Sequence, residues 1–209
     1  ESGCKGVTVY REGSRSGVLI STKDKEKKKD GTFPTKRPEV LEADIVRFQN
    51  NKDKWIAFIG LRSGIPFEIF TGPEDLELFP IPKSVTSGEI IKVKTEEYTR
   101  YDFKYTDSYN YVNTLGGLSR MFDKEFWNYA RLISGMLRNK LPIKTVIEII
   151  DSMHVDSTSL NNWKSGVIRA LKEFITDGTE SSEECPNCKT NLVYVNGCKQ
   201  CNNCGWSKC

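Results

Sequence analysis

The chain has 209 residues, of which 37% are hydrophobic and 11% aromatic, enough for one or two domains with a buried core. Lys and Arg number 31 against 28 Asp and Glu, and a net charge of +3 is too small to favour a nucleic-acid or membrane partner. No stretch approaches about 18 consecutive apolar residues, and no signal-peptide pattern opens the chain. We therefore expect a cytoplasmic protein that does not bind a membrane.

The N-terminal part divides into two segments. Residues 1–21 hold two short apolar runs around a polar turn, without partners for a core, so we expect this segment to pack on further protein. Residues 22–38 are rich in Lys with acidic residues interspersed, which predicts a solvated charged linker. The interrupting acids and the lack of an aromatic platform argue against nucleic-acid binding by this linker.

A β-rich region follows. Short runs of β-branched and aromatic residues, separated by Gly, Pro, Asn and Ser, predict antiparallel strands between residues 40 and 105. The runs are ADIVRF, WIAFIGL, PFEIF, EIIKVK and YTRYDFKY. We expect Trp55 and the tyrosines of these runs to fill the core rather than to form a binding face.

The hydrophobic period then becomes helical. Asp123 is expected to cap a first helix, Pro142 to lie in the first turn of a second, and Ser157 or Ser159 to begin a third. The apolar stripe of the third helix would consist of Leu160, Trp163, Val167, Leu171 and Phe174 or Ile175. Together these elements predict an α+β domain over residues 39–176, with a small, mainly antiparallel sheet covered by about three helices.

The last 25 residues, 185–209, contain six of the seven cysteines. Two CxxC turns, Cys185 to Cys188 and Cys201 to Cys204, are separated by twelve residues, and together they supply the tetrahedral sulfur set that zinc accepts. Because so short a segment cannot bury a core, a bound metal would supply most of its folding energy. We expect a zinc ribbon, joined to the domain by the polar, flexible linker 177–184.

The ligand set has an alternative, because Cys198 and Cys201 also form a CxxC and could replace the second turn. Gly205, directly after Cys204, favours the first choice, since the residue past such a turn often needs a conformation that glycine adopts easily. Cys198 and Cys209 would then be unligated. They are either spare cysteines or a redox pair, and we favour the redox pair, with Lys208 stabilising the Cys209 thiolate.

Three parts of the chain resemble one enzyme family. GCKGVTVYREGSRSGVL resembles the stretch near the end of the catalytic barrel in adenosylcobalamin-dependent (class II) ribonucleotide reductases. RPEVLEADIVRF, WIAFIGLRSGIPFEIFTG and YARLISGMLRNKLPIKTVIEII are similar to the C-terminal accessory region of that family. The segment from CPNC to CGWSKC is similar to its cysteine-rich, zinc-finger-like tail.

The resemblance implies that the chain is the C-terminal portion of a larger enzyme that reduces ribonucleotides, diphosphates in this branch, for DNA synthesis. An α/β barrel holding the radical cysteine and the adenosylcobalamin contacts would precede Glu1, residues 1–21 would end that barrel, and Cys4 would be a barrel residue. This chain alone should be inactive. In the family, a mobile tail dithiol reduces the active-site disulfide and is reset by thioredoxin, which implies that role for Cys198 and Cys209, with the linker supplying the reach.

A competing hypothesis is a zinc-ribbon module that binds nucleic acid or protein without a redox role. The segment from 185 to 209 has only Lys189, Lys199 and Lys208 as basic residues, and Trp206 as its one aromatic that looks exposed. These are few contacts for affinity that depends on phosphate, so the nucleic-acid version of the hypothesis is the weaker reading.

Overall fold

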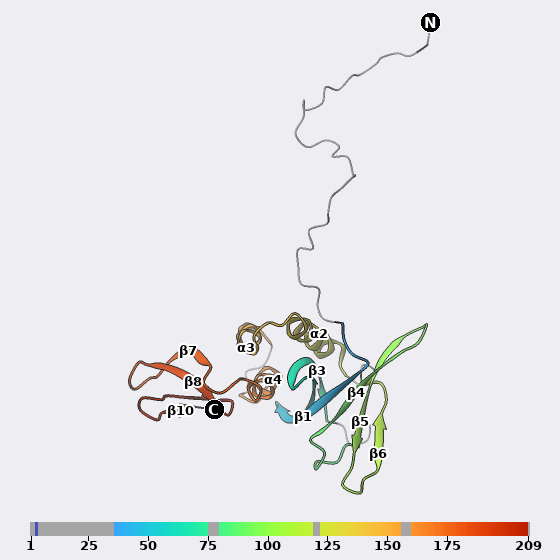
Figure 1. Ribbon diagram of the computed structural model, residues 1–209, viewed down its shortest axis with the longest axis horizontal. Helices are drawn as coiled ribbons and strands as arrows, with labels where there is room; N and C mark the ends of the chain where they lie inside the picture. The colour runs from blue at the N-terminus through green and yellow to red at the C-terminus, as the bar shows by residue number, and fades with distance from the viewer. Residues whose placement is uncertain (1–2, 4–35, 75–79, 119–121, 156–159, 209) are drawn as a thin grey trace. The chain divides into compact units, whose positions relative to one another are not determined.

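The computed structural model describes residues 3, 36–74, 80–118, 122–155 and 160–208 (Figure 1). The chain divides into two units, Glu1–Thr32 and Phe33–Cys209, and the elements below all belong to the second unit. The predicted barrel end, residues 1–21, lies outside the described residues except for Gly3, and so do most of the charged linker and Cys209.

The first part of the fold is a six-stranded sheet with the order β3-β2-β1-β4-β5-β6 (Figure 1). Its strands are β1 (Val40–Asn50), β2 (Asp53–Arg62), β3 (Ile65–Pro73), β4 (Ser87–Lys94), β5 (Thr99–Thr106) and β6 (Val112–Leu115). Every neighbouring pair is antiparallel. The five sequence runs predicted as strands lie in β1 to β5, so the prediction of a mainly antiparallel sheet is confirmed.

Three helices follow among the described residues: α2 (Lys124–Arg138), α3 (Ile143–Ser152) and α4 (Trp163–Lys172). The Asp123 carboxylate accepts a hydrogen bond from the amide of Glu125 at 2.8 Å, which confirms the predicted cap of the first helix. Pro142 stands at the N-cap position, directly before α3. None of these helices is long and apolar enough to cross a membrane, a finding that applies to the described part of the chain.

The predicted start of the third helix is wrong. Asn162 is its N-cap, and the Asn162 side chain accepts a hydrogen bond from the Ser165 amide at 2.8 Å. Leu160, which we placed in the apolar stripe, is 93% exposed. The stripe therefore begins at Trp163, because an asparagine competes well with a serine as a cap and the pattern of apolar residues does not distinguish them.

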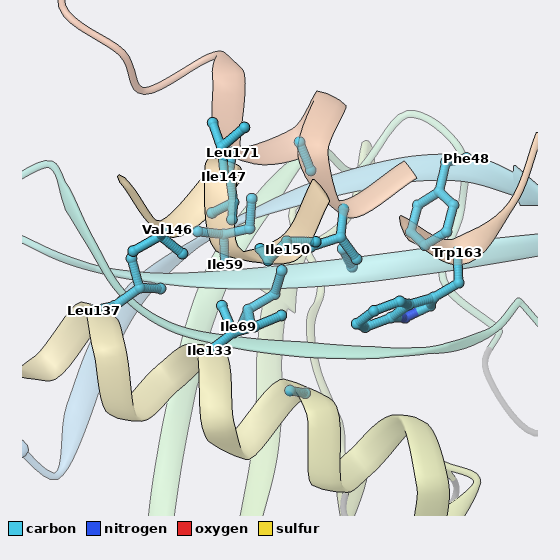
Figure 2. Close-up of a cluster of buried hydrophobic side chains, with 14 of the residues drawn as sticks. Phe48, Ile59, Ile69, Ile133, Leu137, Val146, Ile147, Ile150, Trp163 and Leu171 are labelled. Carbon is cyan, nitrogen blue, oxygen red and sulfur yellow. The ribbon is translucent and has the colours of Figure 1, made fainter. Parts of the chain in front are cut away.

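The helices cover one face of the sheet and form the larger core with it (Figure 2). Side chains from α2, α3 and α4 meet those of β2 and β3, with Ile59 and Ile69 at the centre (Figure 2). Trp163 is fully buried and its indole nitrogen donates a hydrogen bond to the Thr71 hydroxyl at 3.0 Å. The predicted α+β class is confirmed.

The other face of the sheet is also buried. Along β2, the residues from Trp55 to Gly60 are buried without alternation, as expected for a strand covered on both sides. On this second face, Phe58 and Phe103 pack against residues that lie outside the strands. The covering residues are Ile81, Val85, Leu118 and Phe122. We call the unit formed by β1 to β6 and α2 to α4 the body.

A buried ionic group ties the start of the described chain to the body. Arg37 was predicted to lie in a solvated linker, but its side chain is only 5% exposed and its Nη2 lies 2.6 Å from Oε1 of Glu68. Glu68 is fully buried in β3, and Arg138 of α2 binds its other oxygen at 2.7 Å. The prediction failed for Arg37 because a charged run is normally solvated, and the partner is a single acid inside the apolar run PFEIF.

A second, four-stranded sheet contains the cysteine-rich segment, with the order β10-β9-β8-β7. Its strands are β7 (Glu180–Glu184), β8 (Asn191–Val195), β9 (Cys198–Gln200) and β10 (Ser207–Lys208). We call these four strands and their connections the ribbon. The segment 177–184, expected to be a flexible linker, thus includes a strand, and its sequence ESSEE gave no strand signal because β7 depends on pairing with β8.

The ribbon is in contact with the body. Tyr194 of β8 is only 4% exposed and belongs to the core that the helices form. The Asn196 amide donates a hydrogen bond at 2.7 Å to Oδ1 of Asp177, which lies in the segment between α4 and β7. At Gly197, where φ is +75°, an added Cβ would lie 3.2 Å from the Lys172 carbonyl oxygen at the end of α4. The turn between β8 and β9 therefore approaches the backbone of the body closely.

Candidate metal centre

Four cysteines of the ribbon converge on one site. The sulfur atoms of Cys185, Cys188, Cys201 and Cys204 all lie within 4.8 Å of one another. Two sulfur–sulfur distances, Cys185 to Cys204 and Cys188 to Cys201, are 3.4 Å. Cys185 and Cys201 are buried, Cys188 is half-buried and Cys204 is exposed. The structure thus brings together the four residues that the sequence predicted as zinc ligands.

The two CxxC turns have the same backbone hydrogen bonds. The carbonyl of Cys185 accepts from the Lys189 amide at 2.9 Å, and the carbonyl of Cys201 accepts from the Gly205 amide at 3.0 Å. The amides of the two cysteines donate to the carbonyls of Thr190 and Trp206, at 2.8 and 2.7 Å. Two equivalent turns facing one another present their sulfurs to a shared centre.

The residue after each turn adopts a left-handed conformation. Gly205 has a φ of +75°, as the sequence reasoning anticipated, and Lys189 occupies the equivalent position with a φ of +62°. This conformation suits glycine and strains a lysine. Both turns require the left-handed conformation at the residue after the CxxC, which explains why a glycine follows the second CxxC.

Thr190 supports two of the four sulfurs, and sequence reasoning missed it. Its hydroxyl lies 3.1 Å from the sulfur of Cys188 and 3.2 Å from that of Cys201. Hydrogen bonding from Thr190, by the hydroxyl first and then the amide, lowers the pKa of the Cys188 thiol to about 5. The same hydroxyl lowers the pKa of Cys201. A threonine two residues after a CxxC is too common to be recognised as a ligand-supporting residue without the fold.

The donor set fits a zinc ion. Zinc bonded to four thiolates at about 2.3 Å places its sulfurs roughly 3.8 Å apart, close to the separations observed here. The low pKa of Cys188 favours the thiolate, the form that binds a metal. The pKa of Cys204 is raised to about 12, because the lowering by the Trp206 amide is outweighed by burial and by hydrogen bonds with the neighbouring sulfurs. The group could therefore hold a metal ion such as zinc, with Cys185, Cys188, Cys201 and Cys204 as its ligands.

Cys198 lies outside this group. It is half-buried in β9 and is disulfide-bonded, whereas the four clustered cysteines are free. The alternative ligand set, in which Cys198 replaces Cys204, is therefore not the one that the structure assembles. Cys209, its predicted redox partner, lies outside the described residues.

The chain combines an α+β body with a ribbon that carries a candidate four-cysteine metal centre. The chain belongs to the NrdJ homologue C-terminal domain family, whose model matches residues 41–176. This match relates the chain to the class II ribonucleotide reductases, as the resemblance in its sequence implied. The match covers the body and does not reach the cysteines of the ribbon. No curated protein and no solved structure matches the chain.

Proposed function

We propose that this chain serves a class II ribonucleotide reductase as its electron-delivering accessory part, with a cysteine pair in the ribbon as the carrier. The observation that carries the proposal is the division of the ribbon cysteines into two kinds. Four are free and gathered in one site, while Cys198 is disulfide-bonded nearby in the sequence. Membership of the NrdJ homologue C-terminal domain family supplies the link to a reductase.

The proposed partner of Cys198 is Cys209, which follows β10 in the sequence. In the antiparallel pairing of β9 and β10, Gln200 faces Ser207 and Lys199 faces Lys208.

The chemistry is two successive exchanges that conserve electrons. Reduction of the ribose 2′-hydroxyl consumes two thiols of the reductase and releases water, leaving a disulfide. A thiolate of the reduced ribbon pair attacks that disulfide and forms a mixed disulfide, which the second ribbon thiol resolves. The reductase regains its two thiols, and the ribbon keeps the new disulfide. A dithiol protein such as thioredoxin then reduces the ribbon pair by the same two steps and is itself oxidised.

The metal centre would have a structural role in this scheme. Bound zinc would hold Cys185, Cys188, Cys201 and Cys204 as thiolates and keep them from forming disulfides with the redox pair. A site closed by four cysteines has no open coordination position, which disfavours a hydrolytic role. Adenosylcobalamin, the radical source that the family resemblance implies, would bind to the catalytic barrel, and we assign no residue of the body to it.

Delivery of the dithiol requires motion, and the contacts between ribbon and body indicate which part moves. The burial of Tyr194 in the core joins β8 to the body, and Gly197 in the turn after β8 approaches the Lys172 carbonyl at the end of α4. Hydrogen bonds from Gly178 to Tyr194, from Tyr194 to Thr179 and from Asn196 to Asp177 hold the segment between α4 and β7 against β8 and the turn after it. We propose that ribbon and body approach the reductase active site together, in place of the independent movement on residues 177–184 that the sequence suggested.

The proposal is tested by replacing Cys198 with serine in the chain combined with its catalytic barrel. Cys198→Ser should abolish turnover driven by thioredoxin, while zinc content and a single turnover driven by a small dithiol stay unchanged. Cys188→Ser is the matched control and should lose zinc. Thioredoxin-driven turnover that persists in Cys198→Ser at the unmodified rate would refute the electron-carrier role and leave the ribbon as a structural or binding module.

A further inference from the structure

The turn between β5 and β6 exposes an unusual concentration of large apolar side chains. Tyr109 is 80% exposed, Tyr111 70% and Val112 62%. These three residues lie within four consecutive positions, and they belong to neither the metal centre nor the contact between ribbon and body. Tyrosines concentrated in this way are typical of protein interfaces, because each offers a large contact area and a polar tip.

The turn is held in one conformation by a carboxylate. Asp107 accepts hydrogen bonds from the amides of Tyr109 and Tyr111, both at 2.9 Å, and from the side-chain amide of Asn113 at 3.1 Å. These contacts fix the backbone from which the two tyrosines project. A turn organised before binding loses less conformational freedom when a partner binds.

Strand β6 beside this turn is an edge of the six-stranded sheet, and it pairs only with β5 among the described strands (Figure 1). The Asp107 amide donates a hydrogen bond to the Tyr111 carbonyl at 3.0 Å, so the backbone groups of Tyr111 point toward β5. Because successive residues of a strand point their backbone groups to opposite sides, Val112 and Thr114 direct theirs away from β5. Natural edge strands are often protected by Lys, Pro or a bulge, and the sequence VNTL has neither residue.

The charge pattern indicates what covers this edge. Residues 108–119 form a run of twelve residues without a charge, in a chain of which 28% of the residues are charged. When a short strand pairs with the same strand of a second copy about a two-fold axis, a charged side chain on one copy lies close to the identical charged side chain on the other copy. An uncharged edge avoids this repulsion, whereas an edge that selects a different protein commonly uses charges to do so.

We propose that β6 is a self-association edge, which pairs in antiparallel fashion with β6 of a second copy of this chain. With the two-fold axis at Asn113, Val112 of each copy would pair with Thr114 of the other through the outward backbone groups. The two sheets would then form one continuous sheet, and the tyrosines of each turn would extend the contact. This inference is independent of the proposed electron transfer.

Sedimentation equilibrium of the zinc-loaded chain, with reductant present to exclude disulfide-linked species, tests the proposal. We expect a monomer–dimer equilibrium with a Kd below about 1 mM. Val112→Lys should raise the Kd at least about tenfold, since it places a cation on the edge of both copies. Ile65→Lys is the matched control, because Ile65 is 63% exposed in β3, and it should leave the Kd unchanged.

A second variant tests the backbone pairing itself. Thr114→Pro removes an outward amide without removing a bond to β5, and it should abolish the dimer while circular dichroism stays unchanged. In the unmodified chain, the amides of Val112 and Thr114 should gain protection from hydrogen exchange as concentration rises. A chain that stays monomeric at millimolar concentration, or a dimer equally weakened by Val112→Lys and Ile65→Lys, would overturn the proposal. Binding of another protein at this edge by a monomeric chain would also overturn it.

Discussion

The body and the ribbon of this chain are stabilised by different interactions. The body buries large side chains on both faces of a six-stranded sheet, in two clusters that include Phe58 and Trp163. The ribbon has a small cluster of its own, in which Leu192 is the one buried residue that is not a cysteine. Its largest buried side chain, Tyr194, packs in the core of the body.

This difference shows where each part obtains its stability. A sheet covered by helices gains its stability from apolar burial, which no single residue dominates. In the ribbon, the buried cysteines Cys185 and Cys201 take the place of a core, so its fold depends on what binds the sulfurs. The two regions should therefore respond differently to chelation, to charge substitutions and to pH.

Removal of a zinc ion held by the four clustered cysteines should have the largest effect. We expect a strong zinc chelator to unfold the ribbon, because metal binding supplies roughly 10–16 kcal/mol in small zinc modules. The body should keep a cooperative thermal transition. Amide spectra recorded before and after chelation would show loss of dispersion for β8 and β9 and retention for β1 to β5. Simultaneous unfolding of both regions would contradict the separation of their stabilities.

The buried ionic group of the body should give the next largest effect. Glu68→Gln leaves the Arg37 guanidinium buried without its counter-charge and should lower the free energy of unfolding by about 3–5 kcal/mol. Glu89→Gln is the matched control, since the pair of Glu89 with Lys104 is more than 40% exposed on both sides, and it should cost less than about 1 kcal/mol. Urea denaturation measures both. If both variants lost the same free energy of unfolding, the burial of Glu68 would not determine how much its ion pairs contribute to stability.

A smaller effect is expected from the backbone of the metal-binding turns. Lys189→Gly should relieve the left-handed strain at φ +62° and stabilise the zinc-bound ribbon by about 1 kcal/mol. Gly205→Lys, at φ +75° with no atom near an added Cβ, should destabilise it by a similar amount. Competition with a chelator of known affinity would measure both changes. If Gly205→Lys stabilised the ribbon, the left-handed backbone conformation would not determine which residue is favoured at positions 189 and 205.

The smallest effect should be a local response to acid in the β5–β6 turn. Hydrogen bonds from the Tyr111 amide, the Tyr109 amide and the Asn113 side chain hold the pKa of Asp107 below its usual value. A depressed pKa gives stabilisation that is present above the pKa of the unfolded chain and lost as pH falls through the folded value. Exchange protection of the Tyr111 amide should therefore decrease in acid below about pH 4, the usual range for Asp. Asp107→Asn, which lacks the carboxylate at every pH, is the comparison: its Tyr111 amide should already have the reduced protection at neutral pH.

The sequence predicted the body well because its signals are local. Runs of alternating or continuous apolar residues marked β1 to β5, and Asp123 marked the start of α2. The spacing of the two CxxC turns predicted that Cys185, Cys188, Cys201 and Cys204 could share one centre, which the structure assembles. Cysteine spacing is informative because short turns leave few ways to arrange four sulfurs.

The features that the sequence did not predict depend on contacts between distant residues. Arg37 was assigned to solvent because its partner, Glu68, lies 31 positions away in an apolar strand. Strand β7 was assigned to a linker because its polar sequence becomes a strand only when it pairs with β8. The role of Thr190 and the burial of Tyr194 against the helices likewise depend on tertiary contacts, which hydrophobic periodicity does not contain.

The electron-carrier proposal is tested most directly by mapping which cysteines react with an alkylating reagent in the native, zinc-loaded chain, before and after treatment with thioredoxin. We predict that Cys198 and Cys209 become labelled only after thioredoxin has reduced them, and that the four clustered cysteines stay protected by zinc throughout. Failure of thioredoxin to expose this pair, or labelling of the four clustered cysteines in its place, would contradict the account.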